Sequence, residues 1–225
     1  MNIDKLKDVL SEISLGNNLG EEITLVGATK TMDIETINDA VKNGLKVVAE
    51  NRVQEFREKH DKLIGCEQQF IGHLQTNKVK YLVGKVSLIQ SVDSLHLAQE
   101  ISRQAQKLGV IQKVLIEINV GGELSKSGFD TQNAEQAVKE ITSGLDGIKV
   151  VGLMAMLPRT EDQQTLITLC KKMRGIYDKL KSDGLDLSIL SMGMSSDYKI
   201  AINNGSNMIR LGRTIFGERN YGEKV

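Results

Sequence analysis

Short apolar runs rich in Val, Ile and Leu alternate with amphipathic segments along the 225-residue chain. Eight of these runs have the length and composition of buried strands: 23–30, 45–51, 68–74, 86–92, 112–120, 148–156, 186–194 and 207–213. Helical patterns lie before and between them, over about 2–15, 33–42, up to 64, 77–83, 95–108, 133–142, 162–180 and 197–203. This alternation predicts an α/β fold, a closed (β/α)₈ TIM barrel with an extra amino-terminal helix. An open doubly wound sheet is the alternative, although no G-x-G-x-x-G follows the first strand.

No feature of the chain marks a domain boundary. It contains a single proline, Pro158, and no Gly/Ser-rich linker or low-complexity stretch. We therefore expect residues 1–225 to form one barrel domain. Hydrophobic residues make up 40% of the chain but aromatic residues only 4%, so the core must be aliphatic and Met-rich. Such a core is usual for parallel strands that are buried on both faces.

Charge and cysteine content narrow the class of protein. The 29 Lys and Arg balance 29 Asp and Glu, and no dense basic run is present. Nucleic acid and anionic membranes are therefore not expected as main partners. No apolar stretch approaches the roughly 20 residues that span a bilayer, and the amino terminus lacks a signal-peptide core. With only two cysteines, Cys66 and Cys170, a disulfide framework or a Cys-rich zinc site is not expected. These features predict a cytoplasmic protein.

Lys30 ends the first predicted strand, where the apolar run ITLVGA gives way to polar chain. In a (β/α)₈ barrel the carboxyl-terminal ends of the strands form the working face. A lysine in a partly dry site there can attack a carbonyl as a Schiff-base residue. The alternative is an ordinary solvated loop lysine.

Small and basic residues near the other end of the chain could hold a phosphate. Ser195 and Ser196 lie where a short helix is expected to begin after the seventh strand, and Gly212 and Arg213 end the eighth. Barrels often bind phosphate through these two loops, and a glycine lets a phosphate approach the backbone. A plain serine cap and a tight barrel corner are the alternative explanations. An aldehyde and a phosphate together match pyridoxal 5'-phosphate (PLP).

Other residues at the strand ends have less certain roles. Arg210 lies inside an apolar run and needs a buried partner, either a carboxylate or the ring nitrogen of a cofactor. An arginine at that nitrogen disfavours its protonation and suits transamination poorly. His73 is one of three histidines and could simply hydrogen-bond to the backbone, whereas Met154 and Met194 are expected to pack at the barrel mouth. Residues 50–52 could form a structural hydrogen-bond network.

Several motifs occur together in a characteristic order. They are VGATK, AENRVQE, FIGHLQTNK, INVGGELSKSGF, GLMAM, SMGMSSDYKIAINNGSNMIRLG and IFGERNY. The chain thereby resembles the YggS/PROSC family of pyridoxal phosphate homeostasis proteins from about residue 23 to residue 221. The resemblance implies a fold-type III barrel like the amino-terminal domain of bacterial alanine racemase.

The resemblance also implies roles for individual residues. Lys30 matches the Schiff-base lysine of the family, and Asn51 matches its pocket asparagine. Arg210 matches the arginine that faces the pyridine nitrogen, and the phosphate would be held by Ser195, Ser196, Gly212 and Arg213. Met154 and Met194 are expected to line the pocket. The chain departs from the family at Arg213, where Thr or Ser is more common and a hydroxyl contact is lost, and in its GATK motif, where VSK is usual.

Three functions remain open from the sequence. The first is a non-enzymatic protein that stores, buffers or delivers PLP, because the chain ends just after the eighth strand. A racemase of this fold has a further β-domain that supplies a catalytic tyrosine. The second is a small PLP-dependent amino-acid racemase using Lys30 and His73, and the third is a Schiff-base aldolase. For the first we expect a monomer, with PLP-dependent apo-enzymes as candidate recipients and no catalytic residue.

Overall fold

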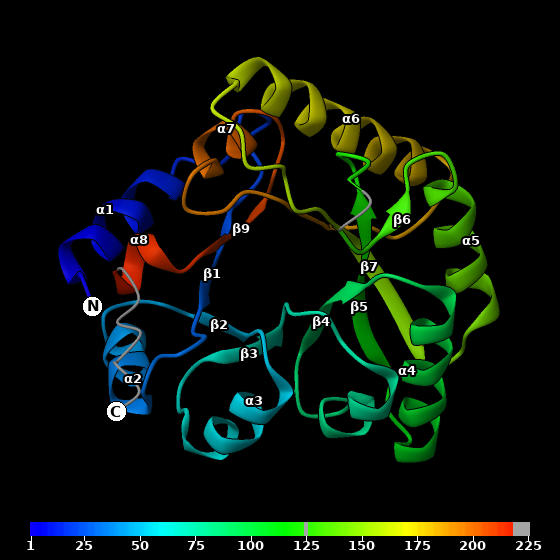
Figure 1. The fold of residues 1–225 in the computed structure, drawn as a ribbon, viewed down its shortest axis with the longest axis horizontal. Helices are drawn as coiled ribbons and strands as arrows, with labels where there is room; N and C mark the ends of the chain where they lie inside the picture. Colours follow the sequence, from blue (N-terminus) through cyan, green and yellow to red (C-terminus); the bar gives the residue numbers. More distant parts are fainter. Residues whose placement is uncertain (124–125, 218–225) are drawn as a thin grey trace.

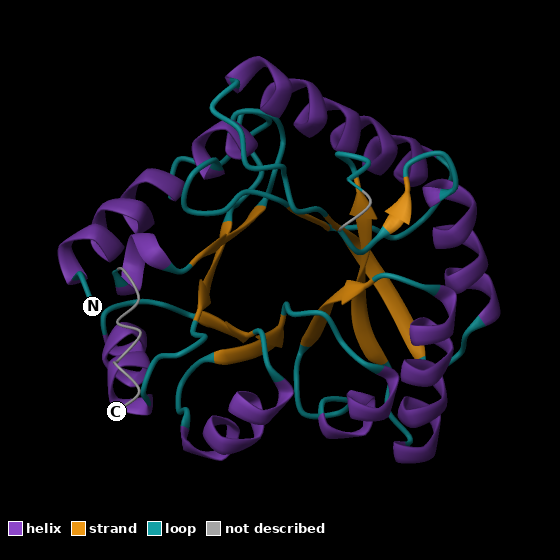
Figure 2. Cartoon of the chain, in the orientation of Figure 1, coloured by secondary structure: helices purple, strands orange, loops and turns teal. Residues whose placement is uncertain are grey.

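A computed structural model describes residues 1–123 and 126–217. These residues form the expected closed barrel of eight parallel strands surrounded by helices (Figures 1 and 2). The end of the IFGERNY motif, two residues of INVGGELSKSGF and the last eight residues of the expected 1–225 domain lie outside this description.

The strands follow one another around the barrel in chain order. They are β1 Thr24–Ala28, β2 Val47–Glu50, β3 Glu67–Phe70, β4 Leu88–Val92, β5 Gln112–Asn119, β7 Ile148–Met154, β8 Ile189–Ser191 and β9 Met208–Leu211. Parallel pairing of β1 with β9 and of β4 with β5 closes the ring. A two-residue strand, β6 Phe129–Asp130, pairs with β5 outside the barrel, and the sequence pattern did not predict it.

Helices connect the strands and cover them. They are α1 Ile3–Ile13, α2 Ile34–Lys42, α3 Val53–Lys59, α4 Leu95–Leu108, α5 Ala134–Gly144, α6 Gln163–Ser182, α7 Tyr198–Ile202 and α8 Arg213–Phe216, with 3₁₀ turns at His60–Lys62 and Thr76–Tyr81. Local capping explains several boundaries, since Asp33 and Ser94 each accept a hydrogen bond from a first-turn N–H. Helix α8 was not predicted, because its four residues are too few to show a helical period of apolar residues.

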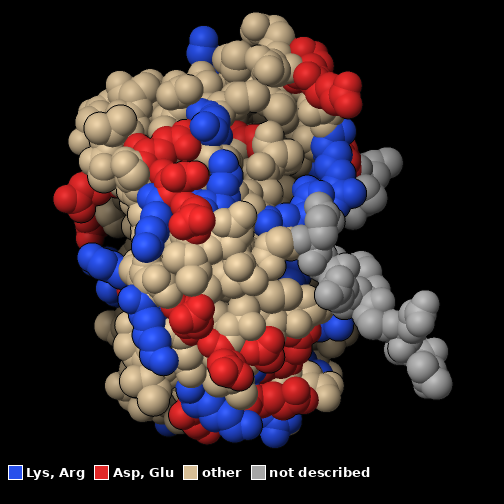
Figure 3. Space-filling model, turned by 90° about the vertical axis from the view of Figure 1, so that its left-hand side faces the viewer, with Lys and Arg blue, Asp and Glu red and all other residues tan. Residues whose placement is uncertain are grey.

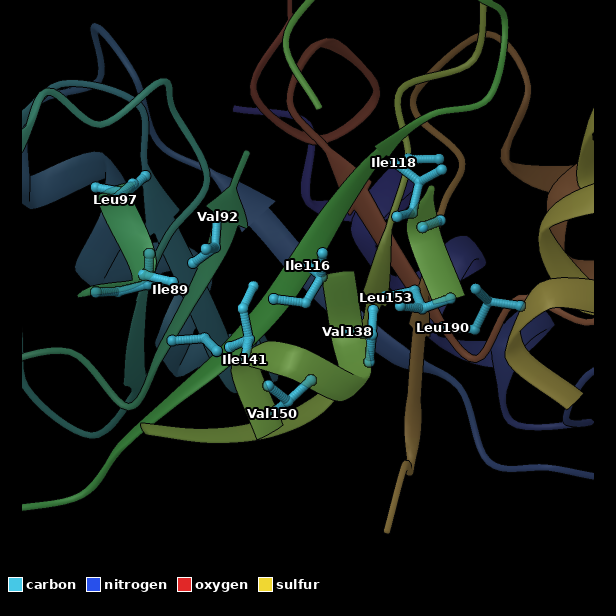
Figure 4. Packing of buried hydrophobic residues seen from close by; sticks show 14 of the residues in the cluster. Ile89, Val92, Leu97, Ile116, Ile118, Val138, Ile141, Val150, Leu153 and Leu190 are labelled. Atoms are coloured by element: carbon cyan, nitrogen blue, oxygen red, sulfur yellow. The ribbon is translucent and has the colours of Figure 1, made fainter. Parts of the chain in front are cut away.

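The core has two layers. A large outer cluster lies between strands and helices, where Ile116 and Val150 of the barrel lie close to Val138 and Ile141 of α5 (Figure 4). A smaller cluster fills the barrel itself: Val26, Val47, Ala49, Leu88, Leu115, Val151, Met154 and Met208. Both clusters are mainly aliphatic and contain Met, as the scarcity of aromatic residues predicted, although the outer one also holds Phe56, Phe70 and Tyr177.

Helix α1 is the extra amino-terminal helix. It buries Leu6, Val9 and Ile13, which join Ile37 of α2 and Ile215 of α8 in one cluster. On the surface at this side of the molecule, Lys and Arg are interspersed with Asp and Glu (Figure 3). None of the described helices is both long and apolar enough to cross a membrane.

Candidate functional site

The predicted site residues gather at the carboxyl-terminal mouth of the barrel. The β1–β2 register pairs Ala28 with Ala49, so Lys30 and Asn51 each follow that pair by two residues. The β1–β9 register pairs Gly27 with Leu211, which sets Gly212 beside Ala28. Residues from both ends of the chain therefore meet at one rim.

An ion cluster beneath the rim holds the loop that carries Lys30. The buried Lys59 Nζ lies 2.6 Å from Glu50 Oε1 and 3.0 Å from Glu55 Oε2, and it donates to the Thr29 carbonyl at 3.1 Å. Glu50 also accepts from the Thr29 hydroxyl at 2.8 Å, and Glu55 accepts from the Thr31 N–H at 2.8 Å. Thr29 and Thr31, the two neighbours of the half-buried Lys30, thus both hydrogen-bond to this ion cluster.

Thr31 shows why this loop needs support. Its φ of 66° is the one positive value among the described non-glycine residues, and a β-branched residue is strained there. Burial raises the pKa of Glu50, although Lys59 and Thr29 oppose the rise. The network that sequence analysis left as an alternative for residues 50–52 is therefore real for Glu50, and Lys59 was missed because it lies nine residues further on.

The expected phosphate segments also come together. Ser195 Oγ accepts a hydrogen bond from the Thr214 N–H at 3.3 Å, which joins the loop after β8 to the start of α8. The Asp197 carboxylate accepts from the Met194 N–H at 2.7 Å and from the Ser196 hydroxyl at 3.0 Å. The loop is therefore ordered by its own contacts.

Gly212 is not a tight corner of the barrel. Its φ is −114°, which any residue adopts, and an added Cβ would lie 3.5 Å from the Ala28 carbonyl oxygen. The protein alone therefore leaves room for a side chain at this position. A glycine is required only if something else, such as a phosphate, approaches the backbone there.

A cavity of about 490 Å³ lies beside these segments. It is lined by Ser196, Asp197 and Arg213, and by Arg159 from the loop between β7 and α6. Arg159 was not predicted from the sequence, because its loop is not one of the two that usually hold phosphate.

Arg210 is buried inside the barrel, at 5% exposure. It donates to the Ser191 hydroxyl at 2.6 Å and to the Ala155 carbonyl at 3.0 Å, so its direct partners are not carboxylates. Burial lowers the pKa of Arg210 to about 10, against the opposing charges of Glu117 and Asp197, and the side chain stays cationic at neutral pH.

Arg210 begins a chain of hydrogen bonds that crosses the barrel and is buried except at its last link. The Ser191 hydroxyl donates to Gln90 at 2.7 Å, Gln90 donates to Gln69 at 2.6 Å, and Gln69 donates to Glu67 at 2.8 Å. An arginine can only donate and a carboxylate can only accept, so the two ends determine the orientation of every group between them. This Arg210–Glu67 chain runs from the mouth to the opposite end of the barrel.

Two buried amide oxygens at the mouth lack a partner. Among the described residues, the buried side-chain polar atoms without a hydrogen bond are Asn51 Oδ1 and Asn119 Oδ1. A buried acceptor left unpaired costs about 1–3 kcal/mol. The mouth thus offers two unpaired acceptors to a hydrogen-bond donor.

Other predicted residues fall into clear places. Met154 belongs to the cluster inside the barrel and Met194 is half-buried at the rim. His73 Nδ1 lies 3.0 Å from Asp93 Oδ2, so it pairs with a carboxylate rather than the backbone. No group of three metal-binding side chains occurs in residues 1–123 and 126–217.

Glu117 is a buried titratable group that was not predicted from the sequence. It lies buried on β5, where burial and the nearby Asp93 raise its pKa to about 7, against the charges of Arg210 and His73. Its signal in the sequence was a charged residue inside the apolar run of residues 112–120.

Comparison with known proteins agrees with this geometry. The family model described as alanine racemase, N-terminal domain, matches residues 24–220. The chain belongs to this family. Within the family it is one of the pyridoxal phosphate homeostasis proteins, as the sequence motifs predicted. The protein of that name from Aquifex aeolicus is 42% identical over 97% of this chain and 96% of its own.

Solved structures support the same fold. The PLP-bound structure of PipY from Synechococcus elongatus has a TM-score of 0.83 and 28% identity, over 95% of this chain and all of PipY. An alanine racemase from Clostridium difficile has a TM-score of 0.79 at 20% identity, over all of this chain and 59% of the racemase. The similarity to the racemase, at this identity, is one of fold alone.

The ion cluster leads to a stability prediction. Lys59→Met leaves Glu50 buried beside no cation, so we expect the free energy of unfolding to fall by about 3–5 kcal/mol. The double variant Lys59→Met, Glu50→Gln should regain more than half of that loss, because the uncompensated charge is gone. Urea unfolding measures both, with the exposed Lys62→Met as control. Equal effects of Lys59→Met and Lys62→Met would contradict the cluster.

Glu117 leads to a pH prediction. Between pH 4.5 and about 7 the folded protein keeps a proton that the unfolded chain releases, so stability contributed by the neutral carboxyl is lost as pH rises. Glu117→Gln should therefore exceed the wild type in unfolding free energy at pH 8 by up to about 3 kcal/mol. The difference should vanish below pH 4.5, and the exposed Glu22→Gln should change stability by less than about 0.5 kcal/mol throughout. A pH-independent Glu117→Gln effect would contradict this assignment.

Proposed function

We propose that this chain binds PLP at the carboxyl-terminal mouth of its barrel, as a Schiff base on Lys30, and that it stores, buffers or delivers the cofactor. The observation that carries the proposal is the β1–β9 pairing, which sets Gly212 beside Ala28, two residues before Lys30. The relatives named pyridoxal phosphate homeostasis protein and the PLP-bound PipY support the same ligand.

The residues at the mouth fit the cofactor in chemical terms. When bound, PLP supplies an aldehyde, a phosphate and an electron-withdrawing ring. The amine of Lys30 suits the aldehyde. The loop with Ser195 and Ser196 lies near Gly212, because Ser195 accepts a hydrogen bond from the N–H of Thr214, two residues after that glycine. Arg213 and Arg159 line the adjoining cavity together with Asp197 and Glu161. Asn51 and Met154, from β2 and β7, complete the proposed pocket with Met194.

Arg210 supports holding the cofactor rather than using it. A permanently cationic side chain opposite the ring nitrogen disfavours protonation there, so the ring withdraws electrons less strongly. The Ser191 hydroxyl, which accepts from Arg210, is oriented by the Arg210–Glu67 chain, so the guanidinium cannot easily turn away. We further propose a monomer in the cytoplasm that passes the cofactor to apo-enzymes. The free thiols of Cys66 and Cys170 suit that compartment.

Reduction with borohydride tests the site. After incubation with PLP and borohydride, we expect a phosphopyridoxyl group on the peptide that contains Lys30, identified by mass spectrometry. Lys30→Ala should lose the adduct, whereas Lys126→Ala, at another half-buried lysine, should keep it. A folded Lys30→Ala variant that still fixes the cofactor covalently would refute the assignment.

Gly212→Ala should fold as the wild type but bind PLP about tenfold more weakly, because the added Cβ occupies the space through which the phosphate approaches the backbone.

A small amino-acid racemase is the second candidate, because His73, which follows β3, and Asp93, which follows β4, form a hydrogen-bonded pair. The two functions differ in α-proton exchange. We expect the PLP-loaded protein to leave the α-proton of L-alanine in D₂O essentially unexchanged over hours, as followed by ¹H NMR. Exchange at enzyme-like rates, lost in His73→Ala, would instead establish the racemase.

A further inference from the structure

A cavity of about 630 Å³ opens at the amino-terminal end of the barrel, opposite the mouth that carries Lys30. Its lining includes the first residues of several strands, among them Thr24 of β1 and Met208 of β9. Barrels of this kind usually act at the other end and fill their interior with side chains. The volume of this cavity lies within the range of roughly 300–1,000 Å³ typical of small-molecule sites.

The inner wall of the cavity is apolar. Val47, Leu88, Val151 and Met208 belong to the cluster inside the barrel, and all four border this space. Helix α1 extends the wall with Leu10 and Ile13. A ligand that fills this cavity must therefore present an apolar body to the barrel.

The rim of the cavity is charged. Lys46 and Lys113 are exposed and line the cavity at the starts of β2 and β5. The third charge is Glu67, whose Oε1 already accepts from Gln69 at 2.8 Å and from the Ser87 hydroxyl at 2.6 Å. Two lysines against one engaged glutamate give the rim an excess of positive charge, which favours an anionic head group.

The cavity also borders the Arg210–Glu67 chain. Gln69 lines it, and Met208 accepts a hydrogen bond from Gln90 through its sulfur at 3.3 Å. A molecule in the cavity therefore contacts Gln69, which is a member of the chain, and Met208, which accepts a hydrogen bond from another member. Hydrogen bonds in such a chain polarise one another, so a change at one end alters the other.

We propose that this cavity is a second ligand site, which takes a small molecule with an apolar body and a carboxylate, and that its occupancy is coupled to the cofactor mouth through the Arg210–Glu67 chain. The apolar body lies against Val151 and Met208, and the carboxylate lies at the lysine rim. The binding part stands on the cavity alone, whereas the coupling rests on the function proposed above.

Octanoate is the probe for the binding part. Isothermal titration of the full chain without cofactor should show saturable binding of one octanoate. Thr24→Phe, which places a ring in the cavity, should weaken it at least tenfold, and the double variant Lys46→Ala, Lys113→Ala at least threefold. Lys149→Ala is the matched control, because this lysine sits beside Lys113 in the β5–β7 register but pairs with Asp186 and does not line the cavity. Absent saturation, or equal binding by all variants, would overturn the site.

Coupling is tested by measuring each ligand in the presence of the other. Octanoate should change the dissociation constant of PLP at least twofold, and PLP should change that of octanoate by the same factor, because coupling between two sites is reciprocal. Thr24→Phe should remove both effects while it still binds PLP. Two unchanged constants would overturn the coupling. Absent PLP binding would instead reject the proposed function, and the octanoate titration would still decide the binding site.

Discussion

The pairing of β1 with β9 is the constraint on which the rest of this structure depends. It joins strands nearly the whole chain apart, in a parallel register that sets Gly27 beside Leu211. Together with the β4–β5 pairing it closes the barrel, and because all these pairings are parallel, the carboxyl-terminal ends of the eight strands lie on one side. Lys30, which follows β1, and the glycine and arginine that follow β9 meet for this reason. Without closure the amine and the phosphate segments would be parts of two unrelated loops.

A chain of hydrogen-bonded polar side chains crosses the otherwise apolar interior of the barrel. Arg210 could have been neutralised by a neighbouring carboxylate, but its hydrogen bonds pass through Ser191, Gln90 and Gln69 to Glu67 at the other end. Each donor in this chain has one allowed orientation, so the guanidinium is held without a counterion in contact. Glu117 supplies negative charge nearby only when it is ionised, and burial opposes its ionisation. The charge of Arg210 therefore has no carboxylate in direct contact, and Glu117 and Asp197 act on it only from a distance.

Much of the fold could be predicted from the residues because the signals are local. Alternating apolar runs set the eight strands, and Asp33, Ser94 and Asp162 set helix starts through their own side chains. The misses have equally local reasons: β6 has two residues and α8 has four, too few for any periodicity. In the site, Lys30, Asn51 and Arg210 were recognisable as polar residues at strand ends or inside apolar runs. Lys59 was not, since its importance depends on contacts with Thr29, Glu50 and Glu55 across loops.

The sequence by itself determined the barrel, the family and the residues that could meet an aldehyde and a phosphate, because periodicity and motif order are properties of the chain alone. Only the tertiary structure decided which polar groups find partners. It showed that His73 pairs with Asp93, that Gly212 leaves room for a side chain, and that two asparagine oxygens stay unpaired. It also revealed the cavity at the far end of the barrel. Hydrogen bonds and cavities depend on distances between strands that are remote in sequence, and those distances exist only once the barrel has closed.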